Sequence, residues 1–366
     1  MFVMRDAGQM KSIALVLGAT IGCGGGGDGE ATALPKASYR VEALTTAPEL
    51  GEVFAFNANG RIVSHSTAHG WIVVDLSTRV FTQITGMTGF VGFNDAGDLL
   101  YSDDRVGATR YILRHGNGAG AEEDIPRVLA DGVEFRPFTL ANDGGIWGFT
   151  ERINAGAAVT PGTGRYAGDH VEQFRDWAGH EPTNDLGQGP RGVDVRGRAV
   201  FCETPAQSGE GGLASTRCRI AAADNTLIDL GTDVPDYWSV LTLQPITPGG
   251  HLGGAVAVGI NGFGGIFPAL FDDGSTEILG EHMGEVIALT DRGDVVFTQL
   301  RVDQPLRVRG PDGVVRDLTP YVINPFAPDA EPFGNEVLAV APDGRMLVQH
   351  GVPGSADPAV DLLTPE

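Results

Sequence analysis

The sequence lacks the motifs of common hydrolases and any long helical period. It contains no Gly-x-Ser-x-Gly nucleophile elbow and no His-Glu-x-x-His zinc motif. No window of its 366 residues shows a long, well-capped helix pattern. These absences leave no recognisable active site, so we keep enzymatic activity open and favour a binding protein. We expect no cofactor.

Positive charge is also scarce. Lys and Arg total 25 and Asp and Glu total 47, which gives a formal net charge of −22. A surface of this sign repels nucleic acid and anionic lipid headgroups, so both are poor partners, and we expect no nucleic-acid binding. The acidity itself is that of a soluble exported protein, which we expect to be a monomer.

Cysteine is rare, with three residues in the chain. Cys202 and Cys218 each lie in a strand-like run, and a polar Gly/Ser/Ala segment separates the two runs. If the runs form a hairpin, an oxidising compartment would allow a disulfide closing a loop of about 15 residues. The alternative is two free buried thiols. Two cysteines without nearby partners are too few for a metal site, so we predict none.

The N-terminus has the pattern of an export signal. Arg5 and Lys11 precede the apolar run Ser12–Ala19, which is too short to span a bilayer. Gly22-Cys23 and the Gly-rich run that follows resemble a bacterial lipoprotein signal. The resemblance implies a signal peptide at 1–22, lipidation of Cys23 with acyl chains such as palmitate, and a flexible tether at 23–37. Plain secretion, an uncleaved anchor or a later start codon remain alternatives.

Seven strand-turn-strand units follow one another along the chain. Their turn glycines are spaced by 37 to 53 residues and are Gly60, Gly97, Gly144, Gly197, Gly249, Gly293 and Gly344. An Asn, Asp or Pro lies within three residues before each glycine, as tight turns require. A second pair of strands follows most units. Four strands at this period are typical of a β-propeller blade.

The pattern therefore predicts an all-β fold at 38–366: a seven-bladed β-propeller of four-stranded antiparallel blades. The last unit ends at Val360–Leu363, which leaves no residues for a fourth strand. Tyr39–Thr45 matches the fourth strand of the first unit. We expect this N-terminal strand to complete the last blade and close the ring.

The turn Ala341-Pro342-Asp343-Gly344 resembles the TolB-type propeller repeat, and the turns with Asn resemble short extracellular repeats of bacterial surface proteins. The resemblance implies that the first strand of each blade lines a central channel. It also implies that the loop between strands two and three lies on the face that carries ligand contacts.

Polar residues occur where the second strands end, five to seven positions after the turn glycines. They are His65, Asp103, Glu151, Glu203, Gln299 and His350. The fold would gather them on one face, where they could bind a cation or sugar or act in acid–base chemistry. The alternative is that strand ends are polar because they are exposed. Trp177 and Trp238, in connecting segments, are candidates for a ligand-stacking platform.

The leading hypothesis is a lipid-anchored cell-envelope propeller that acts as a binding or assembly platform for a protein or glycan. It would lie at the outer membrane, on its periplasmic or surface face, or be secreted if Cys23 is not lipidated. The alternative is an envelope-polymer hydrolase or lyase that uses His and carboxylates on the loop face. A propeller hosts either activity, so the fold does not decide between them.

Overall fold

The described part of the chain is built from β-strands. The computed structural model describes residues 35–105, 107–116, 120–129, 132–152, 160–176, 189–193, 199–203, 217–221, 227–229, 238–244, 252–260, 263–272, 275–279, 284, 286–298, 306–318, 336–350 and 358–366. Leu34–Glu366 form one compact unit. The signal, Cys23 and most of the tether lie outside the described residues. Within those residues the one helix is the single turn α1 (Ala47–Leu50), and none is long and apolar enough to cross a membrane.

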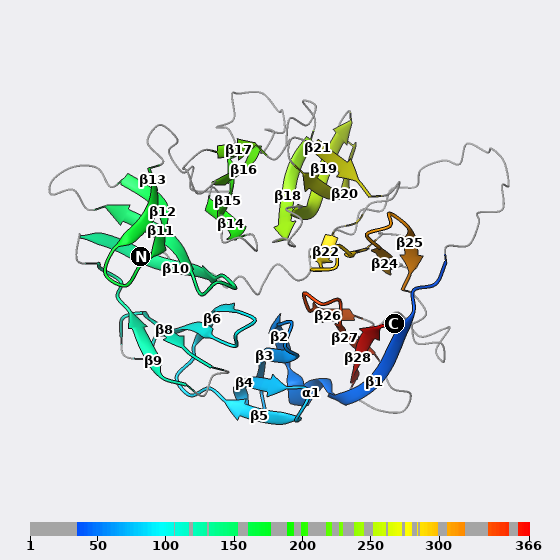
Figure 1. The fold of residues 1–366 in the computed structure, drawn as a ribbon, viewed down its shortest axis with the longest axis horizontal. Coiled ribbons are helices and arrows are strands. Elements are labelled where there is room, and N and C mark those ends of the chain that lie inside the picture. Colours follow the sequence, from blue (N-terminus) through cyan, green and yellow to red (C-terminus); the bar gives the residue numbers. More distant parts are fainter. Residues whose placement is uncertain are drawn as a thin grey trace. The chain divides into compact units, whose positions relative to one another are not determined.

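The described strands form seven antiparallel sheets of four strands each (Figure 1). Sheet 1 is β2 (Glu52–Phe56), β3 (Arg61–Ser66), β4 (Gly70–Asp75) and β5 (Val80–Gln83). Sheet 2 is β6 (Gly89–Phe93), β7 (Leu99–Asp103), β8 (Arg110–Arg114) and β9 (Glu122–Ile125). Sheet 3 is β10 (Val133–Leu140), β11 (Ile146–Arg152), β12 (Thr160–Tyr166) and β13 (Val171–Asp176).

The remaining four sheets follow the same order, except that the last takes its outer strand from the N-terminus. Sheet 4 is β14 (Gly189–Val193), β15 (Ala199–Glu203), β16 (Arg217–Ala221) and β17 (Leu227–Asp229). Sheet 5 is β18 (Trp238–Gln244), β19 (Leu252–Ile260), β20 (Phe263–Asp272) and β21 (Ser275–Ile278). Sheet 6 is β22 (Val286–Leu289), β23 (Val295–Thr298), β24 (Leu306–Arg309) and β25 (Val315–Asp317). Sheet 7 is β26 (Glu336–Val340), β27 (Met346–His350), β28 (Ala359–Pro365) and β1 (Tyr39–Thr46). The prediction of an all-β fold of repeated four-stranded units is confirmed.

Five of the predicted turns lie in the described residues, and all five have one backbone geometry. In each, the glycine donates its N–H to the carbonyl three residues earlier and has a φ between 80 and 90°. These glycines are Gly60, Gly97, Gly144, Gly293 and Gly344. A type I turn followed by a left-handed residue gives this pattern, and glycine adopts it without steric strain. The predicted turns at Gly197 and Gly249 lie outside the described residues.

The first strand of every sheet carries a β-bulge, which the sequence patterns did not predict. The bulged residues are Phe54, Val91, Phe138, Arg191, Leu241, Ile287 and Leu338. The residue after each bulge is small: Ala55, Gly92, Thr139, Gly192, Thr242, Ala288 and Ala339. At Gly92 an added Cβ would lie 2.6 Å from the backbone nitrogen of Leu140 in the next sheet. Small residues at this position therefore allow first strands of neighbouring sheets to approach closely.

Apolar cores join consecutive sheets. Described cores lie between sheets 1 and 2, 2 and 3, 5 and 6, and 6 and 7. A further core joins sheet 7 to sheet 1, where Leu347 and Val360 pack with Ile62 and Ile72. Each strand supplies two cores because successive side chains point to opposite faces. Ile62 thus packs toward sheet 7, and Val63 packs toward sheet 2.

Hydrogen bonds also link the turns of neighbouring sheets. The Asp95 carboxylate in sheet 2 accepts from the backbone N–H of Ala58 at 2.8 Å and from Asn142 Nδ2 at 2.8 Å. Arg345 in sheet 7 donates from Nη2 to the Ala58 carbonyl at 2.7 Å. The turns of sheets 7, 1, 2 and 3 are therefore connected in that order.

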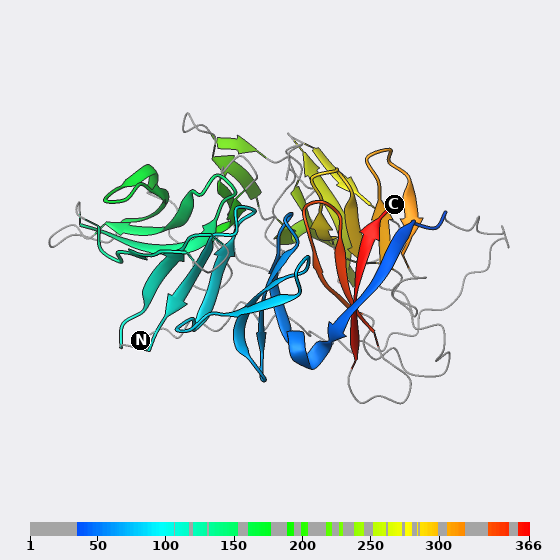
Figure 2. The ribbon, with the colours of Figure 1, turned by 60° about the horizontal axis from the view of Figure 1, so that its bottom comes forward.

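β1 pairs with β28 as the sequence predicts, and Figure 2 shows the two strands side by side. The pairing runs from Tyr39 opposite Pro365 to Thr46 opposite Ala359. The segment just before β1, which the sequence assigns to the end of the tether, is bound to sheet 6. Ala37 donates its N–H to the Asp317 carbonyl at 3.1 Å and is 5% exposed. Ala37, just before β1, is therefore held against sheet 6.

Candidate functional site

The second strand of each sheet finishes at the end opposite the first turn, and we call this the loop end. Three of the predicted polar residues have described side chains there: His65 in sheet 1, Asp103 in sheet 2 and Glu151 in sheet 3. The side chains of Glu203, Trp238 and His350 lie outside the described residues, as do Gln299 and Trp177 as a whole.

His65 and Asp103 face the same interface between sheets 1 and 2. His65 shares its face of β3 with Val63, which packs in the core between the two sheets. Asp103 shares its face of β7 with Tyr101, which packs in that same core. Glu151 lies on the opposite side, because Ile146 on the other face of β11 packs toward sheet 2. Two of the three described candidates therefore face one interface, where His65 contacts Trp71 and Asp103 contacts Arg105.

Aromatic side chains surround His65. Its ring lies 4.8 Å from that of Trp71, and Trp71 lies 4.7 Å from Phe54. Phe54 also contacts Phe90 of sheet 2, at 5.8 Å between ring centroids. His65 is exposed, and the three other rings are half-buried. We call these four residues the loop-end aromatic cluster. Its tilted rings are held by two sheets, so their positions are preorganised.

Asp103 is a buried, ion-paired carboxylate. Arg105 donates to it from Nε at 2.9 Å and from Nη2 at 2.7 Å, and its backbone N–H adds a third bond. These hydrogen bonds lower the pKa of Asp103 to about 2. Gly86, with a φ of 95°, makes room for the guanidinium, because a Cβ there would lie 2.3 Å from Arg105 Nη2. Asp103 is thus ionised at neutral pH, and the Arg105 guanidinium neutralises its charge.

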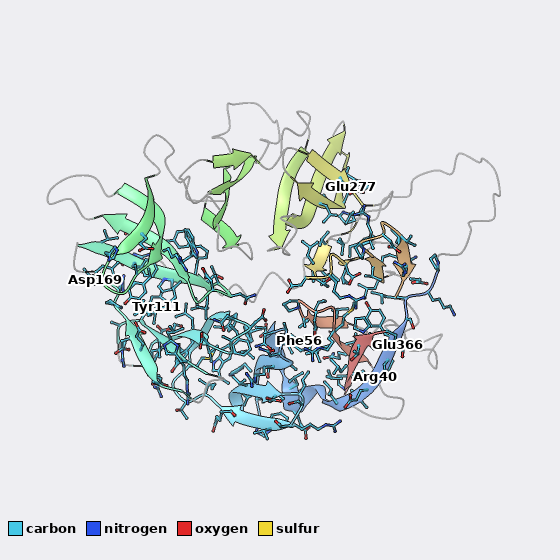
Figure 3. All side chains as sticks on the ribbon, in the orientation of Figure 1. Arg40, Phe56, Tyr111, Asp169, Glu277 and Glu366 are labelled. Atoms are coloured by element: carbon cyan, nitrogen blue, oxygen red, sulfur yellow. The ribbon has the colours of Figure 1, made fainter. Side chains whose placement is uncertain are left out.

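Glu151 belongs to a charged group on sheet 3. Arg136 lies 3.6 Å from Glu151 and 2.9 Å from Glu134, and Arg127 lies 2.7 Å from Glu134. Burial opposes ionisation of Glu134, but hydrogen bonds from the two arginines lower its pKa on balance. Burial raises the pKa of Tyr111, which is labelled in Figure 3, and the charges of Arg136 and Arg127 oppose this rise. The group presents balanced charge rather than a free acid.

A second aromatic pair occurs at the loop end of sheet 3. Phe138 and Phe149 lie 5.4 Å apart between ring centroids. They occupy the same positions in their repeat as Phe54 and His65 in sheet 1, namely six residues before and five residues after the turn glycine. Sequence reasoning missed both groups. The signal that could have found them is an aromatic residue at the bulge position.

The described residues contain no cluster of three or more His, Cys, Asp or Glu side chains placed to hold a metal ion. His65 and His69 instead contact different aromatic rings, Trp71 and Phe81. Cys202 and Cys218 stand directly opposite one another on β15 and β16. The predicted hairpin is therefore confirmed, while the sulfur atoms lie outside the described structure.

No protein-family model and no curated protein sequence matches this chain. Its structure is similar to solved β-propellers. The β-propeller domain of the Trilobed protease from Pyrococcus furiosus, which has an open velcro topology, aligns with a TM-score of 0.54 and 9% identity over 87% of this chain and 96% of that one. Oligogalacturonate lyase in complex with manganese aligns with a TM-score of 0.54 and 16% identity over 91% and 99%. TolB from Acinetobacter baumannii aligns at 0.38 and 13% over 70% and 62%. The first two likenesses show the β-propeller fold and no particular function.

Proposed function

We propose that this chain is an exported cell-envelope protein, lipid-anchored through Cys23, whose sheets form a closed seven-bladed propeller that binds a protein or glycan partner. The observation that carries the proposal is the loop-end aromatic cluster. It combines an exposed imidazole with three half-buried rings held by two sheets. Preformed aromatic surfaces with polar edges are typical of recognition sites.

Closure of the ring is supported by the contacts of sheet 7. Its core with sheet 1 joins the last and first sheets of the series. Its outer strand β1 comes from the N-terminal part of the chain and pairs with β28 from the C-terminal part, so sheet 7 holds the two ends of the chain together. A closed ring holds the loop ends as one rigid platform.

The charged groups at the loop end favour binding over catalysis. A general acid or base works best when its pKa lies near the operating pH. The Asp103 carboxylate has a pKa of about 2, and Arg136 accompanies Glu151. The alternative of an envelope-polymer hydrolase or lyase is favoured by the exposed His65 and by the likeness to oligogalacturonate lyase. It would require Glu203 or His350 to complete a site with His65.

Site-specific photocrosslinking in the native envelope tests the binding proposal. A benzophenone amino acid replaces His65 in one variant and Ala96 in a matched control. Ala96 is also exposed but lies in the first turn of sheet 2, at the opposite end from the loops. We expect a discrete adduct from position 65 that disappears when Trp71→Ala is added, and no such adduct from position 96.

Equal adducts from both positions, or none from position 65, would contradict a loop-end platform. The enzymatic alternative is separated by incubating the purified protein with isolated envelope polymer. Release of fragments by the wild type, lost in His65→Ala, would establish catalysis instead of binding.

The anchor has its own test. Cells fed labelled palmitate are expected to label the wild type and not Cys23→Ser, and the variant should leave the membrane fraction. A Cys23→Ser protein that stays tightly membrane-bound would exclude lipidation of this residue as the anchor.

We also propose that Cys202 and Cys218 form a disulfide in the exported protein. Directly opposed residues of antiparallel strands have Cα atoms about 4.5–5.5 Å apart. This separation falls within the range that disulfides span.

A further inference from the structure

β1 is the longest outermost strand among the seven described sheets. It has 8 residues, whereas the outer strands β5, β9, β13, β17, β21 and β25 have between 3 and 6. β28 pairs with one edge of β1, and no strand of the described chain pairs with the other edge. Exposed strand edges offer unpaired N–H and C=O groups to another strand. β1 is therefore the most accessible template for strand addition.

Several side chains of β1 are also exposed to solvent. Arg40, Val41, Glu42 and Ala43 are four consecutive exposed residues, so both faces of the strand are accessible there. Val41 is 50% exposed, one of few large apolar side chains in the described chain to reach this fraction. Other outer edges are protected. β9 carries three consecutive carboxylates, and the segment around Lys36 covers β25.

Arg40 has no ion-pair partner, unlike the other arginines whose side chains the structure describes. Arg40 is labelled in Figure 3. Glu42, two residues along on the same face, accepts from Arg79 at 2.9 Å through Oε1 and remains 49% exposed. β1 thus carries Arg40, which has no ion-pair partner, on the same face as the exposed carboxylate of Glu42.

The sequence Arg40-Val41-Glu42 is complementary to itself in antiparallel pairing. When two copies pair about Val41, Arg40 of each stands opposite Glu42 of the other. The two Val41 side chains then face one another on the opposite side of the new ladder. Opposite charges and apolar pairs in these positions stabilise antiparallel strands.

We propose that two copies of this chain associate through β1, in antiparallel register centred on Val41, to form a continuous eight-stranded sheet. This association is independent of the loop-end platform and replaces the expected monomer. An interface of one strand pair is small, so the dimer is weak and its population depends on concentration. We expect the strand that pairs with the free edge of β1 to come from a second copy of this chain, because β1 is complementary to itself.

Sedimentation velocity over a concentration series tests the proposal with Arg40→Glu and Glu42→Arg. Each variant places like charges opposite one another in its own dimer, and we expect its dissociation constant to rise about tenfold or more. An equimolar mixture places glutamates of one copy opposite arginines of the other, so association is expected to return. A folding defect would not be repaired by mixing.

Val41→Lys supplies a second disruption, because it puts two cations face to face. Val128→Lys is its matched control, at a valine that is 59% exposed on another part of the surface. The control should sediment like the wild type. A wild type that is monomeric at every concentration, a dimer unaffected by the β1 variants, or a mixture that fails to associate would overturn the proposal.

Discussion

At the residue scale, two different side-chain hydrogen bonds stabilise the first turn of the described sheets. Where the residue three before the glycine is polar, its side-chain oxygen accepts from the N–H just after the glycine. Asn57, Asn94 and Thr290 do so at 2.8 to 3.0 Å. Where that residue is alanine, the aspartate directly before the glycine takes over, as Asp143 and Asp343 do. The turn is thus conserved in geometry while its sequence varies.

Gly144 tests the conformational part of this turn. Its φ is 82°, and nothing lies within 4 Å of an added Cβ, so substitution changes backbone strain alone. We expect Gly144→Ala to lower the free energy of unfolding by about 1–2 kcal/mol, because alanine disfavours the left-handed region. Gly144→Asn should cost less, since asparagine tolerates it. Urea unfolding measures both, and an alanine variant as stable as the wild type would refute the strain.

Asp291 and Asp103 predict opposite responses to pH. Burial, with Asp95 and Asp343 nearby, raises the pKa of Asp291, whereas Arg105 lowers that of Asp103 to about 2. Ionised Asp291 therefore destabilises the fold at neutral pH, and ionised Asp103 stabilises it. We expect Asp291→Asn to melt above the wild type at pH 7 and to lose this advantage as acid protonates Asp291.

Asp103→Asn is the matched control of opposite sign. It should melt below the wild type at pH 7, and the difference should shrink as the pH falls from about 4 toward 2, where Asp103 becomes protonated. Thermal melts of the three proteins between pH 2 and 7 decide the matter. Parallel curves for all three would show that neither carboxylate is coupled to folding.

At the element scale, the strands and turns could be predicted and the bulges could not. Period-two apolar runs and turn glycines are local signals, so they place strands from sequence alone. A bulge depends on how the first strand meets its neighbours in three dimensions. Its signature is nevertheless present: in six of the seven units the bulged residue lies six positions before the turn glycine. In the fifth unit, Leu241 lies eight positions before the predicted turn residue Gly249, which lies outside the described residues.

The candidate site could be predicted only in part, for the same reason. Strand ends identify His65 and Asp103 as residues of the loop end. Sequence position does not reveal that Arg105 folds back onto Asp103, because two residues of separation is compatible with many side-chain directions. It also cannot show that Phe90 of sheet 2 reaches Phe54 of sheet 1.

The β15–β16 hairpin carries the disulfide prediction. Closing a loop of about 15 residues is worth roughly 3 kcal/mol in the chain-entropy model. We expect protein from an oxidising compartment to lose about this much free energy of unfolding in a Cys202→Ser/Cys218→Ser variant. Reduction of the wild type should give the same loss. Two free thiols by titration of the unfolded, unreduced wild type would contradict the bond.

At the scale of the whole molecule, sequence repeats predict the number of units, and long-range contacts decide how they join. The turns of sheets 7, 1, 2 and 3 are linked by hydrogen bonds, and cores connect sheets 5, 6, 7, 1, 2 and 3 in that order. β28 is central to this arrangement. It joins β27 to β1, and it supplies Leu363 to the core with sheet 6 and Val360 to the core with sheet 1.

Closure of the ring through sheet 7 is tested directly by one truncation. Removing the last ten residues deletes β28, leaves β1 without a partner and opens two cores. We predict a large fall in melting temperature and a loss of cooperativity throughout the molecule, measured by calorimetry. Removing residues 1–33, which precede the folded unit, is the control and should leave the transition unchanged. A C-terminal truncation that melts like the full chain would contradict the closed propeller.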